Sequence, residues 1–562
     1  MSAPNVQPQK WPPLQDGLHG KYFKASVAAD HILCSEIGRD ILIQGGNAVD
    51  AAIAGIICLG VVNPMSSGIG GGHFMTVYNK TTQLCNTIDA REAAPAATSE
   101  HMFKENVNGS KIGWKAMAVP GELHGLYTEY KNYGGGLPWK KILQPSIDLL
   151  ENGVPVSMGM AVCLRDEAEN IKADRALREM FVDKKTGEVY KLGDVMYGRK
   201  NYKNLLRSLA DAADPIELFY KGWIADQLSY ELQSSGEAVM TKEDINNYKS
   251  IIRDQKEVIY TDLPNGLRIC GPPPPSSSAI TQSIIKTLSG YTFDQTSKEM
   301  VVDSLHKYLE AAKFGYGHRA DMGDMAFVNT SLALAKNITT DEYVQSVRNR
   351  ITDRAQPTEK YAGKFAFQLD KGTTNIAVID QYGNAVVATT TVNLFFGARV
   401  GSESTGLIWN SQMDDFSNPD APNFYGYPPS PANYIKPGKR PMSSISPLVV
   451  FDKNGTVQLA VGGAGGSQII SGVSTIAMRT LFLGWNVKEA MDRPRLHDQL
   501  MPNVTQFERD FPEEYVQLLS NRGHIMEKTP ALTQATAILR KGNLITANSD
   551  YRKGFESQPA GY

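Results

Sequence analysis

The chain has 562 residues, enough for several domains or for one fold with a large hydrophobic core. Its 57 basic residues nearly balance its 59 acidic ones and no Lys/Arg-rich run is present, so nucleic acid and anionic membrane surfaces are poor candidates for partners. The most apolar stretch, residues 51–62, is well short of the ~20 residues that a membrane-spanning helix needs, and we expect the chain as written to be soluble.

The N-terminal part of the chain is predicted to be a flexible tail followed by helices. Residues 1–22 are polar and proline-rich and lack the apolar core of a signal peptide. Over residues 31–60, apolar side chains recur at spacings of three and four, which predicts two helices separated by a Gly-Gly turn. Asn47 or Asp50 could begin the second helix.

Helical patterns continue as far as residue 349. A glycine-rich turn at 66–72 leads into a strand, and helical patterns then dominate from 119 to 290. A strand near 267–270 and the run GPPPPSSSA, which must be a loop, interrupt them. A polar connector follows the last helical region, residues 298–349.

The C-terminal third changes to short runs of β-branched and apolar residues. Thr373 and Thr374 open the first run, and taken alone they are typical of a strand. The helix-rich first part and the strand-rich second part predict layered α and β structure in one large fold. The strands are expected at 374–380, 384–393, 446–452 and 457–466.

Neither of two glycine-rich turns matches a nucleotide-binding motif. GIGGG at 68–72 precedes a strand rather than a helix, which is the wrong context for a dinucleotide site. GGAGG at 462–466 has the wrong spacing for a phosphate loop, but its backbone N–H groups could serve an oxyanion, or it could simply be a tight turn. The five cysteines contain no CxxC pair and the nine histidines no HExxH or HxH group, so no metal or other cofactor is expected.

Several polar residues could bind a charged ligand, although each also has an ordinary structural explanation. Arg91 could hold a carboxylate in its planar fork or form a surface ion pair. Ser443 and Ser444 could donate hydrogen bonds to an anion or belong to a turn. Three neighbouring residues could hold an ammonium group or cap a helix: Gln412, Asp414 and Asp415.

The order of the motifs resembles the γ-glutamyltransferase family, also called glutathione hydrolases, over residues 23–562. The fold implied is the N-terminal-nucleophile αββα sandwich of the α/β class, two stacked sheets flanked by helices, without a cofactor. The proline-rich tract is most similar to that of animal members. The motifs are GNAVDAAIA, GIGGG, DAREAAP, VPGE, GTT, TTTVN, NSQMDDFS, PPSPANYIKPGKRPMSS, GGAGG, RPRLH and PAGY.

The resemblance implies a precursor that cuts itself. Family members cleave before a threonine that becomes the first residue of a small subunit, and Thr373 matches that position. Cleavage between Gly372 and Thr373 would separate a large subunit, residues 23–372 behind the tail, from a small subunit, residues 373–562. The freed α-amine then lies beside the hydroxyl and can act as its base.

The resemblance also implies catalytic roles in a reaction on glutathione and other γ-glutamyl compounds. Thr373 would form a γ-glutamyl ester, from which water or an amino acid or dipeptide acceptor takes the glutamyl group. Thr391 matches a threonine that orients the nucleophile. Gly465 and Gly466 match the residues whose backbone N–H groups stabilise the oxyanion.

Six further residues match those that hold the free α-amino acid head of the substrate. Ordinary peptide bonds do not leave both α groups free, which explains selectivity for γ-glutamyl bonds. The α-carboxylate is assigned to Arg91, Ser443 and Ser444, and the α-ammonium to Asn393, Gln412 and Asp415.

Cys34 and Cys58 match a disulfide of animal family members, which suits an oxidising compartment. We therefore expect an extracellular protein, secreted or held at the cell surface if an N-terminal anchor is missing from this chain. The other three cysteines have no assigned partner. Six sequons would carry glycans only in a secreted protein: Asn79, Asn108, Asn329, Asn337, Asn454 and Asn503.

Two departures from the family pattern affect the expected activity. Asn375 stands where many members carry His, and Phe395 stands where relatives often carry Tyr, so altered processing or positioning is expected. Two other functions remain open: an unprocessed or inactive homologue that acts as a binding or decoy protein, and a related amidase. The combination of Arg91 with two serines argues against the amidase, because a neutral acyl group needs no carboxylate clamp.

Overall fold

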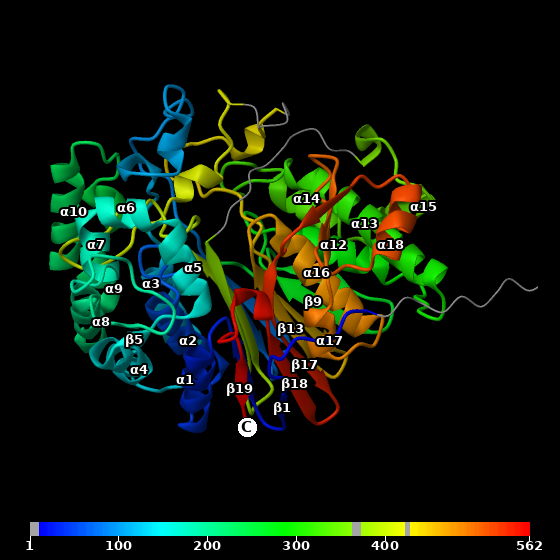
Figure 1. Cartoon of the computed structure of the whole chain (residues 1–562), viewed down its shortest axis with the longest axis horizontal. Helices are drawn as coiled ribbons and strands as arrows, with labels where there is room; N and C mark the ends of the chain where they lie inside the picture. The colour runs from blue at the N-terminus through cyan, green and yellow to red at the C-terminus, as the bar shows by residue number, and fades with distance from the viewer. Residues whose placement is uncertain (1–10, 362–371, 422–427) are drawn as a thin grey trace, which may run out of the picture.

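Two seven-stranded antiparallel sheets pack face to face at the centre of the molecule (Figure 1). The computed structural model describes residues 11–361, 372–421 and 428–562; the start of the predicted tail and part of the polar connector lie outside them. The first sheet has the order β19 (Pro559–Gly561), β2 (Ser26–Ala29), β10 (Thr373–Ile379), β11 (Ala385–Thr391), β3 (Gly72–Asn79), β4 (Leu84–Ala90) and β7 (Ile251–Ile252). The second has the order β1 (Gly20–Tyr22), β18 (Leu544–Ser549), β17 (Gln534–Lys541), β13 (Val457–Ala464), β12 (Leu448–Asp452), β9 (Leu267–Gly271) and β8 (Ile259–Asp262).

Helices cover the outer face of each sheet and complete the four layers (Figure 1). The first sheet is covered by a group from the N-terminal half: α1 (Ile32–Ile43), α2 (Ala48–Val62), α3 (Glu122–Tyr133), α4 (Trp139–Asn152), α5 (Met158–Asp166), α6 (Ala168–Ala173), α7 (Arg175–Phe181), α8 (Lys200–Asp211), α9 (Pro215–Tyr220), α10 (Trp223–Ser235) and α11 (Lys242–Asn247). The second group contains α12 (Ser278–Leu288), α13 (Lys298–Arg319), α14 (Ser331–Asn337), α15 (Asp341–Arg350), α16 (Gln468–Leu481), α17 (Val487–Asp492) and α18 (Glu513–Asn521). None of the helices in the described ranges combines the length and the hydropathy that crossing a bilayer requires.

Smaller pieces of β structure lie outside the sandwich. One pair of strands consists of β5 (Val154–Pro155) and β6 (Val195–Met196), and a three-stranded sheet contains β14 (Leu496–His497), β15 (Thr505–Glu508) and β16 (Met526–Thr529). The strands predicted at 374–380, 384–393, 446–452 and 457–466 correspond to β10, β11, β12 and β13, so these predictions are confirmed.

Strand β10 is buried on both of its faces, which explains its nearly continuous apolar sequence. Ile376 and Val378 pack against the helices of the N-terminal half, whereas Ala377 and Ile379 pack against the second sheet. Because side chains alternate along a strand, Thr373 lies on the same face as Ala377 and Ile379. The candidate nucleophile is therefore on the face of the strand that looks toward the second sheet.

The two helices predicted over residues 31–60 are α1 and α2. Both proposed start residues act at the second helix, because Asn47 and Asp50 form a reciprocal capping box. Cys34 and Cys58 form a disulfide between the two helices, as the resemblance implies. The disulfide holds the two helices together, and α2 packs against β10 and β11 of the first sheet.

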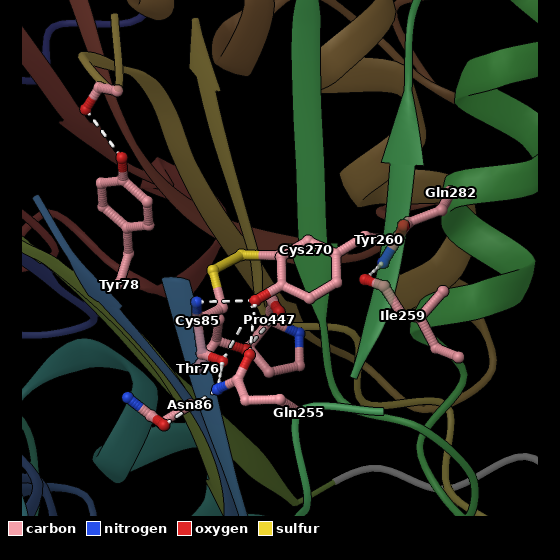
Figure 2. The surroundings of a disulfide bond; sticks show 11 residues. Thr76, Tyr78, Cys85, Asn86, Gln255, Ile259, Tyr260, Cys270, Gln282 and Pro447 are labelled. Atoms are coloured by element: carbon pink, nitrogen blue, oxygen red, sulfur yellow. Dashed lines mark hydrogen bonds between the residues drawn. A yellow bond between two sulfur atoms is a disulfide. The ribbon is translucent and has the colours of Figure 1, made fainter. Parts of the chain in front are cut away.

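A second disulfide, which the sequence analysis did not assign, joins the two sheets. Figure 2 shows Cys85 of β4 bonded to Cys270 of β9, two residues separated by 185 positions in sequence. The Tyr260 hydroxyl accepts a hydrogen bond from the Cys85 N–H at 2.8 Å, and the Gln255 amide donates to the Cys85 carbonyl at 2.7 Å. The cross-link and these bonds tie the edge of one sheet to the other, whereas Cys163 is a buried free cysteine.

Two parts of the described N-terminal tail contact the rest of the fold, whereas flexibility was expected as far as residue 22. Strand β1 pairs with β18 at the edge of the second sheet. Trp11 makes aromatic contacts with Trp485, Phe511 and Tyr515, at ring-centroid distances of 5.9, 5.5 and 5.5 Å. Aromatic burial against α18 and its surroundings thus holds a segment whose polar, proline-rich sequence has no helical or strand periodicity.

Candidate active site

Thr373 and Thr391 lie opposite each other at the same end of the first sheet. Thr373 begins β10 and Thr391 ends β11, and the antiparallel register pairs them directly. Their hydroxyl oxygens are 3.2 Å apart, and both residues are almost completely buried. The register of two neighbouring strands therefore places the predicted orienting residue beside the predicted nucleophile.

The direction of the hydrogen bond between the two threonines follows from the other partners of Thr391. The Thr391 hydroxyl donates its single hydrogen to the carbonyl oxygen of Gly372 at 2.7 Å. Its oxygen accepts from the backbone N–H of Asn393 at 2.8 Å. The Thr373 hydroxyl is therefore the donor to Thr391, so one side chain contacts both the candidate nucleophile and the carbonyl of the preceding peptide bond.

Gly372 is held where no other residue fits. A Cβ atom on it would lie 2.4 Å from the carbonyl oxygen of Asn393 and 2.5 Å from the carbonyl carbon of Leu394. Both are backbone atoms, which cannot move aside as a flexible side chain can. The chain thus requires glycine immediately before Thr373 for a packing reason that is independent of any reaction.

Gly465 and Gly466 form the turn between β13 and α16, at the same end of the sandwich as Thr373. A Cβ atom on Gly462 would lie 2.3 Å from the Asn375 amide oxygen, so β13 crosses β10 at this level. The other end of β13 lies near Tyr78, whose hydroxyl donates to the Gly455 carbonyl, so β13 runs toward Thr373. Both turn glycines have positive φ angles, +121° and +60°, which glycine adopts without strain.

Asn375, one of the two departures expected from the family pattern, bridges the two sheets. Its amide nitrogen donates to the Thr536 hydroxyl of β17 at 2.6 Å, and its amide oxygen accepts from the Thr389 hydroxyl of β11. The carboxamide lies against the α-carbon of Gly462, which leaves no space for a side chain on that glycine. Asn375 thereby fixes the spacing between the strand of the nucleophile and the opposite sheet.

Arg91 is buried immediately after β4 and reaches two of the predicted binding segments. Its Nη2 donates to the Asp415 carboxylate, and its Nε donates to the Pro441 carbonyl at 3.3 Å. Pro441 is two residues before Ser443, whose N–H donates to the Pro275 carbonyl at 2.8 Å. The structure thus brings together Arg91 and Asp415, which were predicted to hold opposite charges of the substrate, and links Arg91 to the serine segment.

The segment around Gln412 lies beside the end of β11. It forms a short 3₁₀ helix, η4 (Gln412–Asp415), and the Asn393 amide nitrogen donates to the preceding Ser411 carbonyl at 2.8 Å. The Gln412 amide nitrogen donates to the Asp415 carboxylate at 2.6 Å. Asn393 has a φ of +76°, a conformation that asparagine tolerates better than most residues. Asn393, Gln412 and Asp415 therefore belong to one local arrangement.

Three buried residues here, which we call the acceptor group, present oxygens with no hydrogen-bond partner in the described ranges. They are Glu92, with both carboxylate oxygens, and Asn393 and Gln412, each with its amide oxygen. Burial raises the pKa of Glu92 to about 8, against the opposing effect of Arg91, whose Nη1 is 3.7 Å away. Buried oxygens without a partner can accept hydrogen bonds from a ligand that brings donors, such as an ammonium group.

Asp414, which the sequence analysis grouped with these residues, has a different partner. Its carboxylate accepts from the Ser110 hydroxyl at 2.8 Å, and burial raises its pKa to about 6. It therefore fixes η4 to the segment of residues 107–110.

Glu92, Asp30 and Lys553 lie at the site but were missed in the sequence. Glu92 is inside the motif DAREAAP, whose arginine alone had been singled out. Asp30 accepts from the Thr374 hydroxyl at 2.7 Å, and Lys553 donates to the Thr373 carbonyl at 2.6 Å. No spacing rule connects residues at opposite ends of the chain, so only their placement near β10 reveals them.

A second buried polar group, which we call the histidine cluster, consists of His306, Glu310, Lys313 and His524. Atoms of His306, Glu310 and His524 lie within 4.8 Å of one another, as metal ligands would. However, His306 Nδ1 contacts His524 Nε2 at 2.8 Å, His306 Nε2 contacts the Thr352 carbonyl at 2.7 Å, and Lys313 contacts His524 Nδ1 at 3.2 Å. Every imidazole nitrogen is already occupied, so this cluster does not suit a metal ion.

The fold is that of the N-terminal-nucleophile hydrolases, with a threonine at the start of a central strand as its candidate nucleophile. Cephalosporin acylase from Bacillus halodurans has this fold with a TM-score of 0.81 at 24% identity, covering 99% of each chain. γ-Glutamyltranspeptidase from Helicobacter pylori matches with a TM-score of 0.53 at 26% identity, over 61% of this chain and 95% of that chain.

The sequence comparisons define the family more closely. A family model described as Gamma-glutamyltranspeptidase matches residues 34–560, and the chain therefore belongs to the γ-glutamyltranspeptidase family. It is similar to Scoloptoxin SSD14 of Scolopendra dehaani, with 39% identity over 95% of this chain and 92% of the relative. Glutathione hydrolase 3 of Arabidopsis thaliana is 35% identical over 89% of this chain and 78% of the relative. The predicted fold class and family are confirmed.

Proposed function

We propose that this protein is a γ-glutamyltransferase and glutathione hydrolase that activates itself by cleavage between Gly372 and Thr373. The observation that carries the proposal is the contact of Thr391 with both the Thr373 hydroxyl and the Gly372 carbonyl. Membership of the γ-glutamyltranspeptidase family and relatives named glutathione hydrolase support the substrate class.

Cleavage begins with attack of Thr373 Oγ on the carbonyl carbon of Gly372. The hydroxyl proton leaves Oγ, the C–N bond breaks, and the nitrogen takes up a proton to become the free α-amine of Thr373. Water then hydrolyses the ester and leaves a carboxylate on Gly372. The Thr391 hydroxyl, which donates to the Gly372 carbonyl oxygen, stabilises the negative charge that this oxygen acquires during the attack.

Turnover uses the same hydroxyl with the new amine as its base. Thr373 Oγ attacks the γ-carbonyl of the donor, its proton passes to the α-amine, and the amine returns a proton to the leaving nitrogen. A γ-glutamyl ester of Thr373 results, and water or an acceptor amine then removes the glutamyl group. The backbone N–H groups of Gly465 and Gly466 are assigned to the oxyanion, an interaction worth about 3–4 kcal/mol for each donor in related chemistry.

The charged head of the glutamyl group is assigned to the surroundings of Arg91. Arg91, Ser443 and Ser444 hold the α-carboxylate, while Asp415 and the unpaired oxygens of the acceptor group hold the α-ammonium. Arg91 and Asp415 contact each other in this structure, so their charges are balanced before substrate binds. The substrate then supplies a carboxylate for Arg91 and an ammonium group for Asp415. A zwitterionic ligand can replace this internal pair without leaving a buried charge unpaired.

We also propose that the protein is extracellular and glycosylated. Two disulfides cross-link the fold, and structural disulfides persist in oxidising compartments. The asparagine of five sequons is exposed and that of the sixth, Asn503, is half-buried. Treatment with an N-glycosidase should lower the mass of protein isolated from its natural source; an unchanged mass would contradict glycosylation.

The test of the proposed function combines denaturing mass spectrometry with release of a chromophore from a γ-glutamyl anilide. Two fragments, one beginning at Thr373, together with turnover are expected. Thr373→Ala should remain a single inactive chain, and Thr373→Ser should cleave and turn over. An uncut, inactive wild-type chain would favour a binding protein, and equal turnover of an anilide without the α-carboxylate would favour an amidase.

A further inference from the structure

Lys553 contacts the candidate nucleophile from the far end of the sequence. It belongs to a short 3₁₀ helix, η6 (Tyr551–Lys553), and its Nζ donates to the carbonyl oxygen of Thr373 at 2.6 Å. The side chain is only 11% exposed. Burying an ammonium group costs free energy. The proposed reaction gives a reason for this cost, because the ammonium binds the backbone of the nucleophile itself.

Asp30 provides the counter-charge and holds the next two residues of the strand. It directly follows β2, and its Oδ2 lies 3.7 Å from Lys553 Nζ. The same oxygen accepts from the Thr374 hydroxyl at 2.7 Å and from the Asn375 N–H at 3.1 Å. Asp30 and Lys553 thus fix the first three residues of β10, with the ammonium at Thr373 and the carboxylate further along the strand.

Two other titratable groups near Lys553 are Asp550 and the Cys163 thiol. Asp550, the N-cap residue of η6, pairs with Arg495 at 2.7 Å and with Arg552 at 3.0 Å. The Cys163 thiol of α5 stays neutral, because burial raises its pKa to about 12. Burial raises the pKa of Asp30, and the nearby Lys553 ammonium opposes this shift.

The position of Lys553 bears on the α-amine that cleavage would create. The nitrogen and carbonyl oxygen of one residue are three covalent bonds apart, so Lys553 Nζ lies within about 6 Å of the new amine. A positive charge at this distance disfavours a second positive charge. An ordinary α-amine has a pKa of about 7.7–8.0 and is mostly protonated at pH 7, when it cannot accept the hydroxyl proton.

We propose that Lys553 is a positioning residue that fixes the Thr373 carbonyl and, after cleavage, keeps a larger share of the Thr373 α-amine unprotonated at neutral pH. The inference rests on the proposed function, because an uncut chain has no such amine. It assigns to the C-terminal segment a part in the acid–base chemistry of a nucleophile at the start of β10, 180 positions earlier in the chain.

The test is the pH dependence of kcat/KM for a γ-glutamyl anilide, measured on fully cleaved protein. In Lys553→Met, the acidic limb of the profile should move upward by about one pH unit or more, whereas Lys553→Arg should keep the wild-type limb. Lys541→Met is the matched control. Lys541 is exposed and also donates to a backbone carbonyl, but it lies at the end of β17 opposite to Thr536. If the acidic limb of the pH profile of Lys553→Met lies at the same pH as in the wild type, the proposal is overturned, whatever the loss of rate.

Two further measurements keep the test decisive if Lys553→Met fails to cleave itself. Residues 1–372 can be produced together with residues 373–562 behind a methionine that aminopeptidase removes, which supplies the amine without self-cleavage. Asp30→Asn removes the opposing charge and should not move the limb upward; an upward shift in both variants would indicate a shared structural role and overturn the proposal. Absence of cleavage and turnover in the wild-type chain would instead refute the proposed function itself.

Discussion

The acceptor group and the histidine cluster are both buried and polar, but they differ in how their hydrogen bonds are satisfied. In the acceptor group, oxygens of Glu92, Asn393 and Gln412 have no partner in the described ranges. In the histidine cluster, both rings are bonded, and Glu310 accepts from the Tyr361 hydroxyl at 2.8 Å. An unpaired buried oxygen destabilises a fold, and a ligand that donates hydrogen bonds to the acceptor group would remove this cost.

The proton positions in the histidine cluster explain why it is self-sufficient. His306 Nε2–H donates to the Thr352 carbonyl, so His306 Nδ1 accepts from His524 Nε2–H. His524 Nδ1 then accepts from the Lys313 ammonium. Two neutral rings in one tautomer satisfy the whole chain of bonds, and no lone pair is left for a metal. We therefore expect changes here to alter stability, and changes in the glutamyl site to alter catalysis.

Arg91→Met is expected to have the largest effect. It removes the fork assigned to the substrate carboxylate and leaves Asp415 buried without its cation. Loss of one member of a buried charge pair costs about 2–5 kcal/mol in binding, so kcat/KM should fall on the order of 10²–10³-fold. Arg91→Lys, which keeps the charge but not the fork, should fall between wild type and Met. A loss of less than threefold in Arg91→Met would remove Arg91 from the binding site.

Acidification should next distinguish the two regions through stability. Burial lowers the pKa of His306 to about 4 and also lowers that of His524, whereas a histidine in the unfolded chain titrates near 6.5. The unfolded chain therefore takes up protons first as pH falls. The stabilising contribution of neutral His306 is complete above pH 6.5 and is lost between about 6.5 and 4, on the order of 2–3 kcal/mol.

Denaturant unfolding of wild type and of His306→Gln at pH 7 and pH 5 measures this effect. The difference in unfolding free energy between the two proteins should shrink at pH 5, because the variant lacks the group that titrates. A constant difference at the two pH values would show that His306 does not control the acid sensitivity.

Gln412→Met should weaken substrate binding while changing stability little. Its amide oxygen is unpaired in the described structure, so the free protein loses only the bond from its amide nitrogen to Asp415. Loss of a hydrogen bond to the substrate ammonium, about 1.5–3 kcal/mol, should raise KM roughly 10- to 100-fold.

Gln282 offers a matched control for Gln412. Its buried amide accepts from the Thr261 hydroxyl at 2.6 Å and donates to the Ile259 carbonyl at 3.1 Å, contacts that Figure 2 shows in part. Gln282→Met should therefore lower the free energy of unfolding without a change in KM. The comparison would fail if both glutamine variants changed stability and KM in the same way.

Tyr361→Phe is expected to have the smallest effect. The Tyr361 hydroxyl donates to Glu310 and accepts from the Gln356 N–H at 2.8 Å. Its removal should lower the free energy of unfolding by about 1 kcal/mol and leave kcat/KM unchanged, as denaturant titration and the anilide assay can show. A change in kcat/KM of tenfold or more would mean that the histidine cluster communicates with the site.

Several features were accessible from the sequence because they depend on local chemistry. The spacing of apolar residues predicted α1 and α2, and the β-branched run after Gly372 predicted β10. The glycines of the β13–α16 turn could be recognised because their positive φ angles suit no other residue as well. The candidate residues from Thr373 to Ser444 came from a resemblance in motifs, and their catalytic roles remain predictions.

Other features were decided only by the tertiary structure. Cys85 and Cys270 meet because β4 and β9, each next to the edge strand of its sheet, face each other across the two stacked sheets, and no spacing in the chain reveals this. The described tail is held by aromatic contacts, not by any periodicity of its own. The chain by itself determined its helices, strands, turns and family, since these follow from neighbouring residues and ordered motifs. Packing decided the partners of Arg91, Asp30 and Lys553, because buried charges are paired by position in space rather than by position in sequence.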